Sequence, residues 1–299
     1  MRIDSGLLPG HVLQRAAKGA TAKLVGTATA SGRITATIAV AGKTVRGWAR
    51  RPVGHAAYGA FNVKLAGIPV GGPYTVTLAV GDERAEVRDV WVGDLWLMAG
   101  QSNMEGCGDL ADAAQPHAQV RAFSMANRWG PAREPLHHLA ESPDLVHNGG
   151  TQETREQAAR GKRARIKGAG VGTRFGNLMQ ERTGVPQGLI AVAHGGTTME
   201  MWDPARRELG GASLYGSMLA TMRAVGQPIA GVLWYQGEGD TSPEAVPHYT
   251  RRMQDFVAAV RTDLRQPKLP FVVVQIGRVI GNEGAGPNWN ALQEQQRLL

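Results

Sequence analysis

The sequence predicts an α/β fold in which a small β-sandwich-like region precedes a doubly wound parallel sheet. Two patterns support this prediction. Up to residue 90, short strand-like segments follow one another between Gly- and Pro-containing turns, and from Trp91 onward strand-like and helix-like segments alternate. The chain of 299 residues is long enough for one large and one small domain. We therefore expect a β-rich region over residues 1–90 and an α/β domain over residues 91–299.

The N-terminal region contains five predicted strands. In each of them apolar and polar residues alternate or β-branched residues are frequent, as in strands with one buried face. These strands cover residues 22–28, 34–40, 61–65, 74–80 and 85–90. Short strands at this spacing favour a sandwich packed against the segment that follows. Nothing in this region points to catalysis.

The α/β domain is predicted from short apolar runs for strands and from apolar residues at helical spacing for helices. The strands are residues 95–99, 189–193, 232–235 and 271–276, and the helices are residues 172–182, 214–225, 247–264 and 288–299. An interval of about residues 109–170, rich in Pro, His and charge, interrupts this alternation. We expect it to be an insertion above the carboxyl edge of the sheet, where it would shape a substrate pocket.

The first candidate for chemistry follows the predicted strand at residues 95–99. Ser102 lies at the carboxyl end of that strand, where open α/β sheets bind their ligands. This position suits a nucleophile. The alternative is a serine that caps the next helix, with Glu105 three residues later completing a capping box.

Two further segments end strands in the same way. Gly195 and Gly196 allow backbone N–H groups to approach a ligand closely, and Gln236 and Glu238 offer an amide and a carboxylate. If the three strands are neighbours, these residues converge with Ser102 on one crevice. A hydroxyl that faces backbone and amide donors is suited to acyl transfer, because negative charge develops on the former carbonyl oxygen.

Composition and charge restrict the partners. The net charge is +8, and six Lys or Arg residues against one Glu lie between Arg155 and Lys167, which we expect to be a solvated, mobile loop. This run has no aromatic residues for stacking bases, so a nucleic-acid partner is not expected. No apolar run approaches the roughly 20 residues needed to cross a bilayer, so no membrane partner is expected either. The single cysteine, Cys107, excludes an internal disulfide and a cysteine-based zinc site.

The first residues lack the apolar segment of a signal peptide. A cytoplasmic protein is therefore expected, or a periplasmic or secreted one if a leader has been removed.

Three blocks of the chain resemble the sialate O-acetylesterase family, which belongs to the SGNH-type (GDSL-like) serine hydrolases and includes acetylxylan esterases. Their order along the chain makes the resemblance specific. The blocks are residues 93–97 with 100–104, residues 195–197 with Trp202, and residues 234–238. Residues 11–15 and 71–74 also resemble the β-rich N-terminal part of bacterial members.

The resemblance implies a flavodoxin-like sheet and deacetylation of sugars through an acetyl-serine intermediate. Ser102 matches the nucleophile, and its own N–H matches one oxyanion donor. Gly195 or Gly196 matches the second donor, Gln236 matches a side-chain donor, and Glu238 is a candidate partner for the catalytic histidine.

Candidate substrate-binding residues lie beside these positions or in the insertion. They are Gln101, Asn103, His138 and Trp202. His138 could contact sugar hydroxyls, and the aromatic face of Trp202 suits a sugar ring. We expect an acetylated sugar as the partner, no cofactor and no metal.

The general base that Ser102 requires is missing from the expected place. The family supplies it from a late Asp-x-x-His block, and no such block follows Glu238. One interpretation is that the C-terminal strand and helix are absent, which would leave an impaired enzyme. The other is that His137, His138 or His147 of the insertion reaches the site. Asp144 and His147 have the matching spacing, but they precede the second and third blocks, so we interpret this match as a coincidence.

Two other functions remain alternatives to the esterase. The first is a catalytically impaired glycan-binding protein that lacks the general-base histidine. The second is a serine hydrolase that acts on other small esters.

Overall fold

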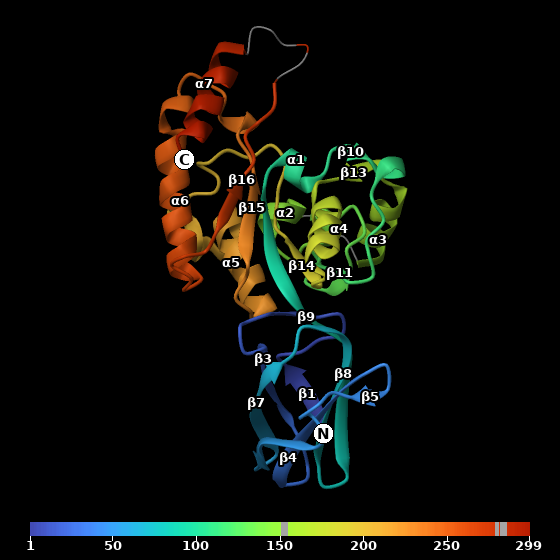
Figure 1. The fold of residues 1–299 in the computed structure, drawn as a ribbon. Helices are drawn as coiled ribbons and strands as arrows, with labels where there is room; N and C mark the ends of the chain where they lie inside the picture. Colours follow the sequence, from blue (N-terminus) through green and yellow to red (C-terminus); the bar gives the residue numbers. More distant parts are fainter. Residues whose placement is uncertain (151–154, 279–280, 282–285) are drawn as a thin grey trace.

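The structure is a computed structural model that describes residues 1–150, 155–278, 281 and 286–299. A β-rich N-terminal region and an α/β region are stacked end to end, and strand β9 (Glu83–Gly100) runs from one into the other (Figure 1). Through β9, fourteen of the described strands join into one sheet, antiparallel in the first region and largely parallel in the second, whereas β10 and β13 pair separately. The predicted mixed α/β fold is therefore confirmed.

The N-terminal region is an antiparallel sheet with the strand order β1-β3-β7-β6-β4-β8-β9. Strand β2 pairs in parallel with β9, and β5 pairs with β4. The strands are β1 (Arg2–Ser5), β2 (Val12–Gln14), β3 (Ala20–Thr27), β4 (Gly32–Val40), β5 (Lys43–Thr44), β6 (Arg51–Ala57), β7 (Ala60–Ile68) and β8 (Gly71–Val80). The sequence predicts β3, β4, β7 and β8 but misses the other four.

Alternating side chains give this region its own core. In β3, Ala20, Ala22 and Leu24 are fully buried. Lys23, which lies between two of them, and Val25, which follows them, are exposed. Because successive side chains of a strand point to opposite faces, each strand contributes every second residue to the interior. The apolar alternation that predicts these strands is thus also the pattern that stabilises them.

Strand β9 joins the two regions without a break. The sequence predicts separate strands at residues 85–90 and 95–99, because Gly93 resembles a boundary. In the structure a Cβ at residue 93 would lie 1.9 Å from the carbonyl oxygen of Pro186. Gly93 therefore permits a close approach of the neighbouring chain, and the domain boundary predicted between residues 90 and 91 falls inside β9.

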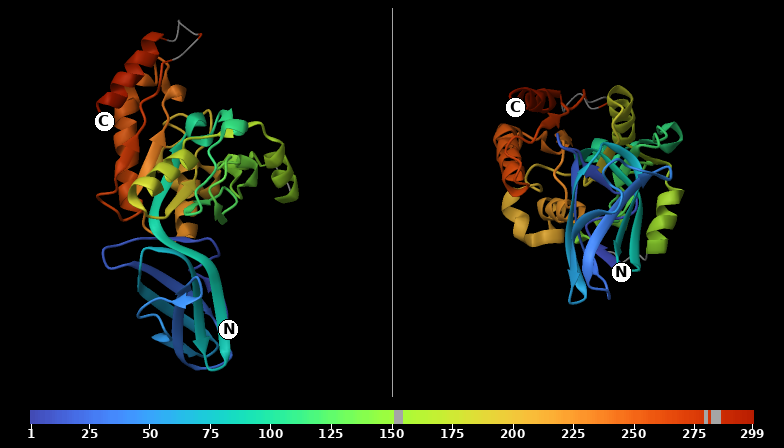
Figure 2. Two further views of the ribbon diagram at one scale, coloured as in Figure 1. Left: turned by 45° about the vertical axis from the view of Figure 1, so that its right-hand side comes forward. Right: turned by 60° about the horizontal axis from the view of Figure 1, so that its bottom comes forward.

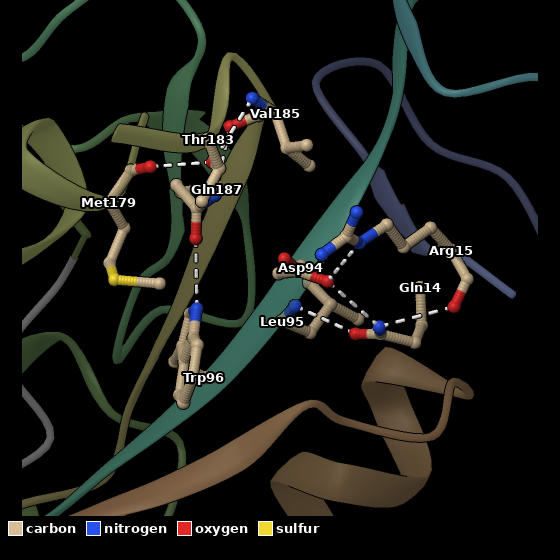
Figure 3. Close-up of polar contacts among 9 residues, drawn as sticks. All are labelled: Gln14, Arg15, Asp94, Leu95, Trp96, Met179, Thr183, Val185 and Gln187. Carbon is tan, nitrogen blue, oxygen red and sulfur yellow. Dashed lines mark hydrogen bonds and ion pairs between the residues drawn. The ribbon is translucent and has the colours of Figure 1, made fainter. Parts of the chain in front are cut away.

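Polar contacts fix the point where β9 enters the α/β region (Figure 3). Asp94 is 5% exposed and accepts hydrogen bonds from Arg15 Nε at 2.7 Å and from Gln14 Nε2 at 3.2 Å. The Gln14 side chain in turn accepts a hydrogen bond from the Leu95 N–H at 2.8 Å. These contacts attach the N-terminal region to β9, because they link β2 and the segment after it to this strand.

The second half of β9 is the central strand of a parallel sheet with the order β11-β14-β9-β15-β16. Strand β12 adds to the β11 edge in antiparallel orientation. These strands are β11 (Val120–Phe123), β12 (Trp129–Pro131), β14 (Gln187–Ala191), β15 (Gly231–Tyr235) and β16 (Phe271–Val273). The predicted strands at residues 189–193, 232–235 and 271–276 correspond to β14, β15 and β16.

Helices cover both faces of this parallel sheet (Figures 1 and 2). Leu97 of β9 belongs to the core shared with helices α5 and α6, whereas Met98, the next residue, belongs to the core beside α4. The long helices are α4 (Gly172–Thr183), α5 (Leu214–Val225), α6 (Tyr249–Asp263) and α7 (Gly286–Arg297), close to the four predicted helices. In the described residues, no helix is both long and apolar enough to cross a membrane.

The interval at residues 109–170 differs from its prediction in two ways. It contributes β11 and β12 to the sheet itself, and its His147 contacts His194, which lies beyond the end of β14. Its basic run forms a helix, α3 (Arg155–Ala164), where the sequence predicts a loop. The interval also contains β10 (Gly108–Asp109), β13 (Lys167–Ala169) and α2 (Leu145–Asn148).

Short 3₁₀ helices complete the described elements. They are η1 (Leu110–Asp112), η2 (Leu139–Glu141), η3 (Pro204–Ala212), η4 (Glu238–Asp240) and η5 (Val246–His248).

Candidate active site

Ser102 is presented by a tight turn between β9 and the short helix α1 (Ser102–Glu105). The turn needs Gly100, which has φ +135° and where a Cβ would lie 2.1 Å from the carbonyl oxygen of Tyr235. Gln101 N then donates to that same oxygen at 2.9 Å. Ser102 is half-buried, and its hydroxyl makes no hydrogen bond with any residue that the structure describes. The hydroxyl is thus available to a substrate.

The helix-cap alternative for Ser102 is wrong. Gln101 occupies the N-cap position of α1, and no side chain caps this helix. Glu105 does not complete a capping box either, because its Oε2 accepts a hydrogen bond from Gly195 N at 2.6 Å. Burial raises the pKa of the Glu105 carboxyl, whereas this hydrogen bond and nearby Arg165 lower it. Sequence reasoning missed this contact, since only the capping-box spacing singled out Glu105.

The two glycines play different parts beside Ser102. Gly195 packs against it, because a Cβ at residue 195 would lie 3.6 Å from the Ser102 Cβ. The Gly195 N–H is already engaged by Glu105. Gly196 is exposed and has φ +70°, and its N–H has no backbone partner among the described residues. Of the two predicted oxyanion donors, Gly196 is therefore the one whose N–H is free.

Gln236 does not fit its predicted role as an oxyanion donor. Its Nε2 donates to the carbonyl oxygen of Thr197 at 3.0 Å and to Asp240 Oδ2 at 2.6 Å, so both amide hydrogens are used within the protein. The residue is fully buried. Gln236 instead connects the end of β15 to the loop that carries the glycine pair.

Gln101, Asn103 and Glu238 surround Ser102 from the β15 side. Asn103 is exposed, and its Nδ2 donates to Glu238 Oε1 at 2.6 Å. Glu238 Oε2 is buried without a hydrogen-bond partner in the described part of the chain. Gln101 is only 4% exposed, and its Oε1 accepts from the N–H groups of residues 237 and 239 at 3.2 and 3.1 Å. Asn103 is therefore better exposed to a substrate than Gln101.

Two predicted substrate contacts are too buried for that role. Trp202 is fully buried between Trp234 and Phe256, and its indole N–H donates to Thr197 Oγ1 at 3.1 Å. It supports the glycine loop from the core and offers no face to a sugar. His138 is 7% exposed and lies beneath α3, with Nε2 3.9 Å from where a Cβ on Gly161 would be.

The insertion brings His147 close to His194, which precedes the glycine pair. His147 Nδ1 lies 3.0 Å from the Nδ1 of His194, the residue before Gly195. His147 Nε2 lies 3.1 Å from Ser217 Oγ, which donates to Asp144 at 2.5 Å. The spacing of Asp144 and His147, a coincidence by the order of the sequence blocks, thus corresponds to a physical connection through Ser217. No sequence signal pointed to Ser217.

His137, another histidine of the insertion, is also buried. Its Nε2 is 3.4 Å from the carbonyl oxygen of Met98, and burial lowers its pKa to about 4. Within the described ranges, no group of three or more His, Cys, Asp or Glu side chains is arranged to hold a metal ion.

Comparison with known proteins adds an independent line of evidence. Residues 92–299 match the family model described as carbohydrate esterase, sialic acid-specific acetylesterase. A probable carbohydrate esterase of Arabidopsis thaliana is 26% identical over 223 residues, which are 67% of this chain and 75% of that protein. The sialate O-acetylesterase of Mus musculus is 27% identical over 236 residues, which are 74% of this chain but 36% of the mouse protein.

One solved structure resembles the whole chain. The crystal structure of a carbohydrate acetylesterase from Xanthomonas citri has a TM-score of 0.64 and 25% identity, and the match covers 99% of this chain and 66% of that protein. The chain thus spans about two thirds of the bacterial relative and about a third of the mouse one.

Proposed function

Because this chain belongs to the sialic acid-specific acetylesterase family of carbohydrate esterases, a family of carboxylic ester hydrolases, we propose that it is a serine esterase for acetylated sugars. Its substrate would be O-acetylated sialic acid or another acetylated carbohydrate. Sialic acid carries a carboxylate, and the net charge of +8 favours an anionic substrate of this kind.

The strand order supports an SGNH-type, flavodoxin-like domain. In chain order, the strands β9, β14, β15 and β16 lie in the sheet as β14-β9-β15-β16. Counted without β11, which lies at the β14 edge, this is the order 2-1-3-4 of the flavodoxin-like sheet, whose ligands bind where the connections diverge, between the first and third strands; with β11 included, the five parallel strands have the order 2-3-1-4-5. Ser102 follows the first of these strands, and Gln236 follows the third. The proposed site therefore lies at the switch point of the sheet.

The observation that carries the proposal is an unpartnered hydroxyl beside a free backbone N–H. Ser102 Oγ would attack the acetyl carbonyl carbon, and the resulting oxyanion would accept hydrogen bonds from the N–H groups of Ser102 and Gly196. Neither N–H has a backbone partner among the described residues. Each such donor typically contributes about 3 kcal/mol of transition-state stabilisation.

Acetyl transfer to Ser102 would release the sugar hydroxyl, and water would then hydrolyse the acetyl-serine. Asn103 at the rim is exposed and is our candidate for contacting the sugar. Its amide is held by Glu238, which limits its rotation.

Acetate release tests the proposal. The substrates are O-acetylated sialic acid, acetylated xylo-oligosaccharide and p-nitrophenyl esters of increasing acyl length. We expect a preference for acetyl esters and a loss of about 10⁶-fold in kcat for Ser102→Ala, as for removal of other serine nucleophiles. Ser31→Ala, an exposed serine in the N-terminal region, is the matched control and should leave kcat unchanged.

Three results would contradict the proposal. Turnover that survives Ser102→Ala would exclude the serine mechanism. A strong preference for long acyl chains would favour a hydrolase of other esters. Equal glycan binding by the parent and Ser102→Ala proteins without acetate release would favour a glycan-binding protein.

A further inference from the structure

A cavity lies where the N-terminal region meets the α/β region, and we call it the joint cavity. It is lined by residues from two segments, residues 4–23 and residues 223–228 at the end of α5. Its volume is about 730 Å³, which is within the range of pockets that bind small molecules. Hydrogen bonds hold its two walls together, because Gln14 N donates to Gln227 Oε1 at 3.3 Å and Gln227 Nε2 donates to the carbonyl oxygen of Thr21 at 3.4 Å.

The joint cavity is separate from the proposed active site. Strand β2, which contributes Gln14 to the wall, pairs with β9 as far as Gly93, whereas Ser102 follows the other end of β9 at Gly100 (Figure 1). A strand rises about 3.3 Å per residue, so this segment of β9 places the two sites roughly 20 Å apart. A ligand in the joint cavity therefore does not occupy the position of the reacting ester.

His11 is buried in the wall of the joint cavity with both ring nitrogens unpartnered. The ring is 4% exposed and stacks on Trp129 with the two centroids 5.2 Å apart. Neither Nδ1 nor Nε2 has a hydrogen-bond partner among the described residues. Such buried polar atoms cost free energy, and most of those in folded proteins are satisfied. Because His11 lines the cavity, a bound ligand can supply the missing partners.

The protonation state of His11 restricts the chemistry of that ligand. Burial lowers the pKa of this ring to about 4, so the ring is neutral near neutral pH. A neutral imidazole offers one N–H donor and one acceptor nitrogen. Hydroxyl groups match both, since each can donate and accept, whereas an ionised carboxylate or phosphate only accepts. The ligand that fits His11 therefore carries hydroxyl groups.

The wall also carries two free positive charges. Lys23 of β3 and Arg223 of the last turn of α5 are exposed, and neither side chain forms a hydrogen bond or ion pair with a residue that the structure describes. Arg15 and Asp4, the other charged residues of the lining, already take part in ion pairs. Two cations thus remain for an acidic group of the ligand.

The end of α5 adds hydrogen-bond acceptors to the wall. The carbonyl oxygens of residues 223–225 accept no backbone hydrogen bond among the described residues, as is usual in the last turn of a helix. Pro228, which also lines the cavity, has no N–H that could satisfy them. Acceptors beside free cations suit a ligand that combines hydroxyl groups with an acidic group.

The joint cavity continues around the end of α5. A second cavity of about 800 Å³ shares Arg223 and residues 226–228 with it. The further charged residues of this second cavity, two of each sign, are Arg207, Glu208, Asp263 and Arg265. Their charges cancel, so the second cavity suits uncharged parts of a ligand. An elongated ligand can extend from one cavity into the other.

We propose that the joint cavity binds an acidic oligosaccharide. Its acidic group lies beside Lys23 and Arg223, one of its hydroxyl groups contacts His11, and its neutral sugar units extend into the second cavity. The anionic character of the ligand follows from the cavity alone, whereas its identification as a saccharide also rests on the proposed function. The site holds a glycan on the protein at a distance from Ser102.

Calorimetric titration with sialyllactose tests the proposal, because this saccharide joins an acidic sugar to a neutral disaccharide. Lactose is the neutral comparison, and inorganic phosphate is the comparison for charge alone. We expect sialyllactose to bind more tightly than either, and its binding to weaken as the salt concentration rises, because salt screens exposed charges. Equally tight binding of lactose or of phosphate would overturn the proposal.

Charge reversals locate the acidic group. Lys23→Glu and Arg223→Glu should each raise the Kd of sialyllactose by about tenfold or more, because each replaces an attraction by a like-charge repulsion. Arg182→Glu is the matched control and should leave this Kd unchanged. Like Arg223, Arg182 is an exposed arginine in the last turn of a helix, but it does not line the cavity.

Replacing the His11 ring tests the hydroxyl contact. His11→Phe keeps an aromatic ring and removes both nitrogens, so the Kd of sialyllactose should rise by about 3–10-fold, the effect of losing a neutral hydrogen bond. The Kd of phosphate should not change. Unchanged binding of sialyllactose in His11→Phe, Lys23→Glu and Arg223→Glu would overturn the proposal.

NMR of the histidine rings in the unmodified protein is independent of variant folding. Sialyllactose should shift the ring resonances of His11. Absence of this shift, or shifts confined to His147 and His194 near the glycine pair, would overturn the proposal. A single-stranded oligonucleotide that binds more tightly and shifts the same His11 resonances would overturn it in favour of a nucleic-acid partner. Failure of the proposed function has a different signature, since no acetate would be released while sialyllactose still shifted His11.

Discussion

The N-terminal β region and the carboxyl edge of the parallel sheet bury different kinds of side chain. The interior of the first is apolar, with residues such as Leu24, Ile38 and Leu65 fully buried. At the edge of the second, polar groups are buried without hydrogen-bond partners among the described residues. They include Gln236 Oε1, Glu238 Oε2 and Asp240 Oδ1.

This difference separates a region whose interior is apolar from the edge of the sheet at which we propose that the chemistry takes place. A buried polar group that lacks a partner typically costs about 1–3 kcal/mol. Burial also raises the pKa of Asp240, so the ionised form of this carboxyl is disfavoured. Burying these polar groups therefore costs free energy, which the apolar cores of both regions must offset. Pairs of similar substitutions, one in each region, should show which side chains affect only the free energy of unfolding and which also affect kcat.

The largest effect on the free energy of unfolding is expected from two matched changes, Trp202→Ala and Trp48→Ala. Both side chains are buried, Trp202 under the glycine loop and Trp48 in the N-terminal core. Each change should lower the free energy of unfolding by about 3–5 kcal/mol, measured by urea titration. Only Trp202→Ala should also lower kcat, because it removes the hydrogen bond to Thr197. A rise in KM alone, with kcat intact, would contradict this account and favour a sugar contact.

Acid should destabilise the joint between the regions through His11. This ring is 4% exposed, stacks on Trp129 at 5.2 Å, and has a pKa lowered by burial from 6.5 to about 4. Between these pH values the unfolded chain binds a proton that the folded chain does not, so stability is lost as the pH falls from 6.5 to about 4.

Replacing this ring should remove that part of the acid dependence. The difference between His11→Phe and the parent should reach on the order of 3 kcal/mol near pH 4, measured by urea titration at several pH values. His137 and His147 contribute loss of the same sign, so some acid dependence will remain. An unchanged slope in His11→Phe would contradict the buried-neutral state, and His55→Phe is the exposed control.

A smaller effect is expected at the polar contacts of Asp94. Asp94→Ala leaves Arg15 and Gln14 without this acceptor and should cost about 1–3 kcal/mol in stability. Arg15 is 43% exposed and can turn to water, which limits the loss. The kcat of the folded enzyme should not change. A large fall in kcat at unchanged stability would mean that the joint also controls the geometry around Ser102.

The smallest effect on the free energy of unfolding is expected at two glycines with similar backbone conformations. Gly196 has φ +70° and directly follows Gly195, and Gly42 has φ +75° in the turn between β4 and β5. A Cβ would meet no atom within 4 Å at either position. Each change to Ala should cost about 1 kcal/mol from left-handed backbone strain. Gly196→Ala alone should lower kcat, and equal kcat values would argue against Gly196 as an oxyanion donor.

Much of the fold could be predicted because the apolar pattern that marks an element also buries it. Strands such as β3 and helices such as α5 were found in this way. The prediction was wrong at Gly93, because a glycine in the sequence indicates the end of a strand. In the structure this glycine instead permits the close approach of Pro186 within a continuous strand. The basic run of α3 misled it as well, because a helix with few apolar residues lacks the periodicity on which the prediction relies.

The candidate site was predictable only in part. Ser102 and the glycine pair follow strands, so their convergence could be inferred from the parallel sheet. The engagement of Gln236 by Thr197 and Asp240 could not, since these contacts depend on how two loops meet. The link from Asp144 to His147 through Ser217 likewise needs the packing of α2 against α5.

Trapping the acyl-enzyme tests the central claim most directly. The protein is mixed with p-nitrophenyl acetate, quenched rapidly in acid, digested and analysed by mass spectrometry. We predict one added acetyl group on the peptide that contains Ser102, formed before steady-state turnover begins. Turnover without acetylation of Ser102, or acetylation of a different residue on the reaction pathway, would contradict the account.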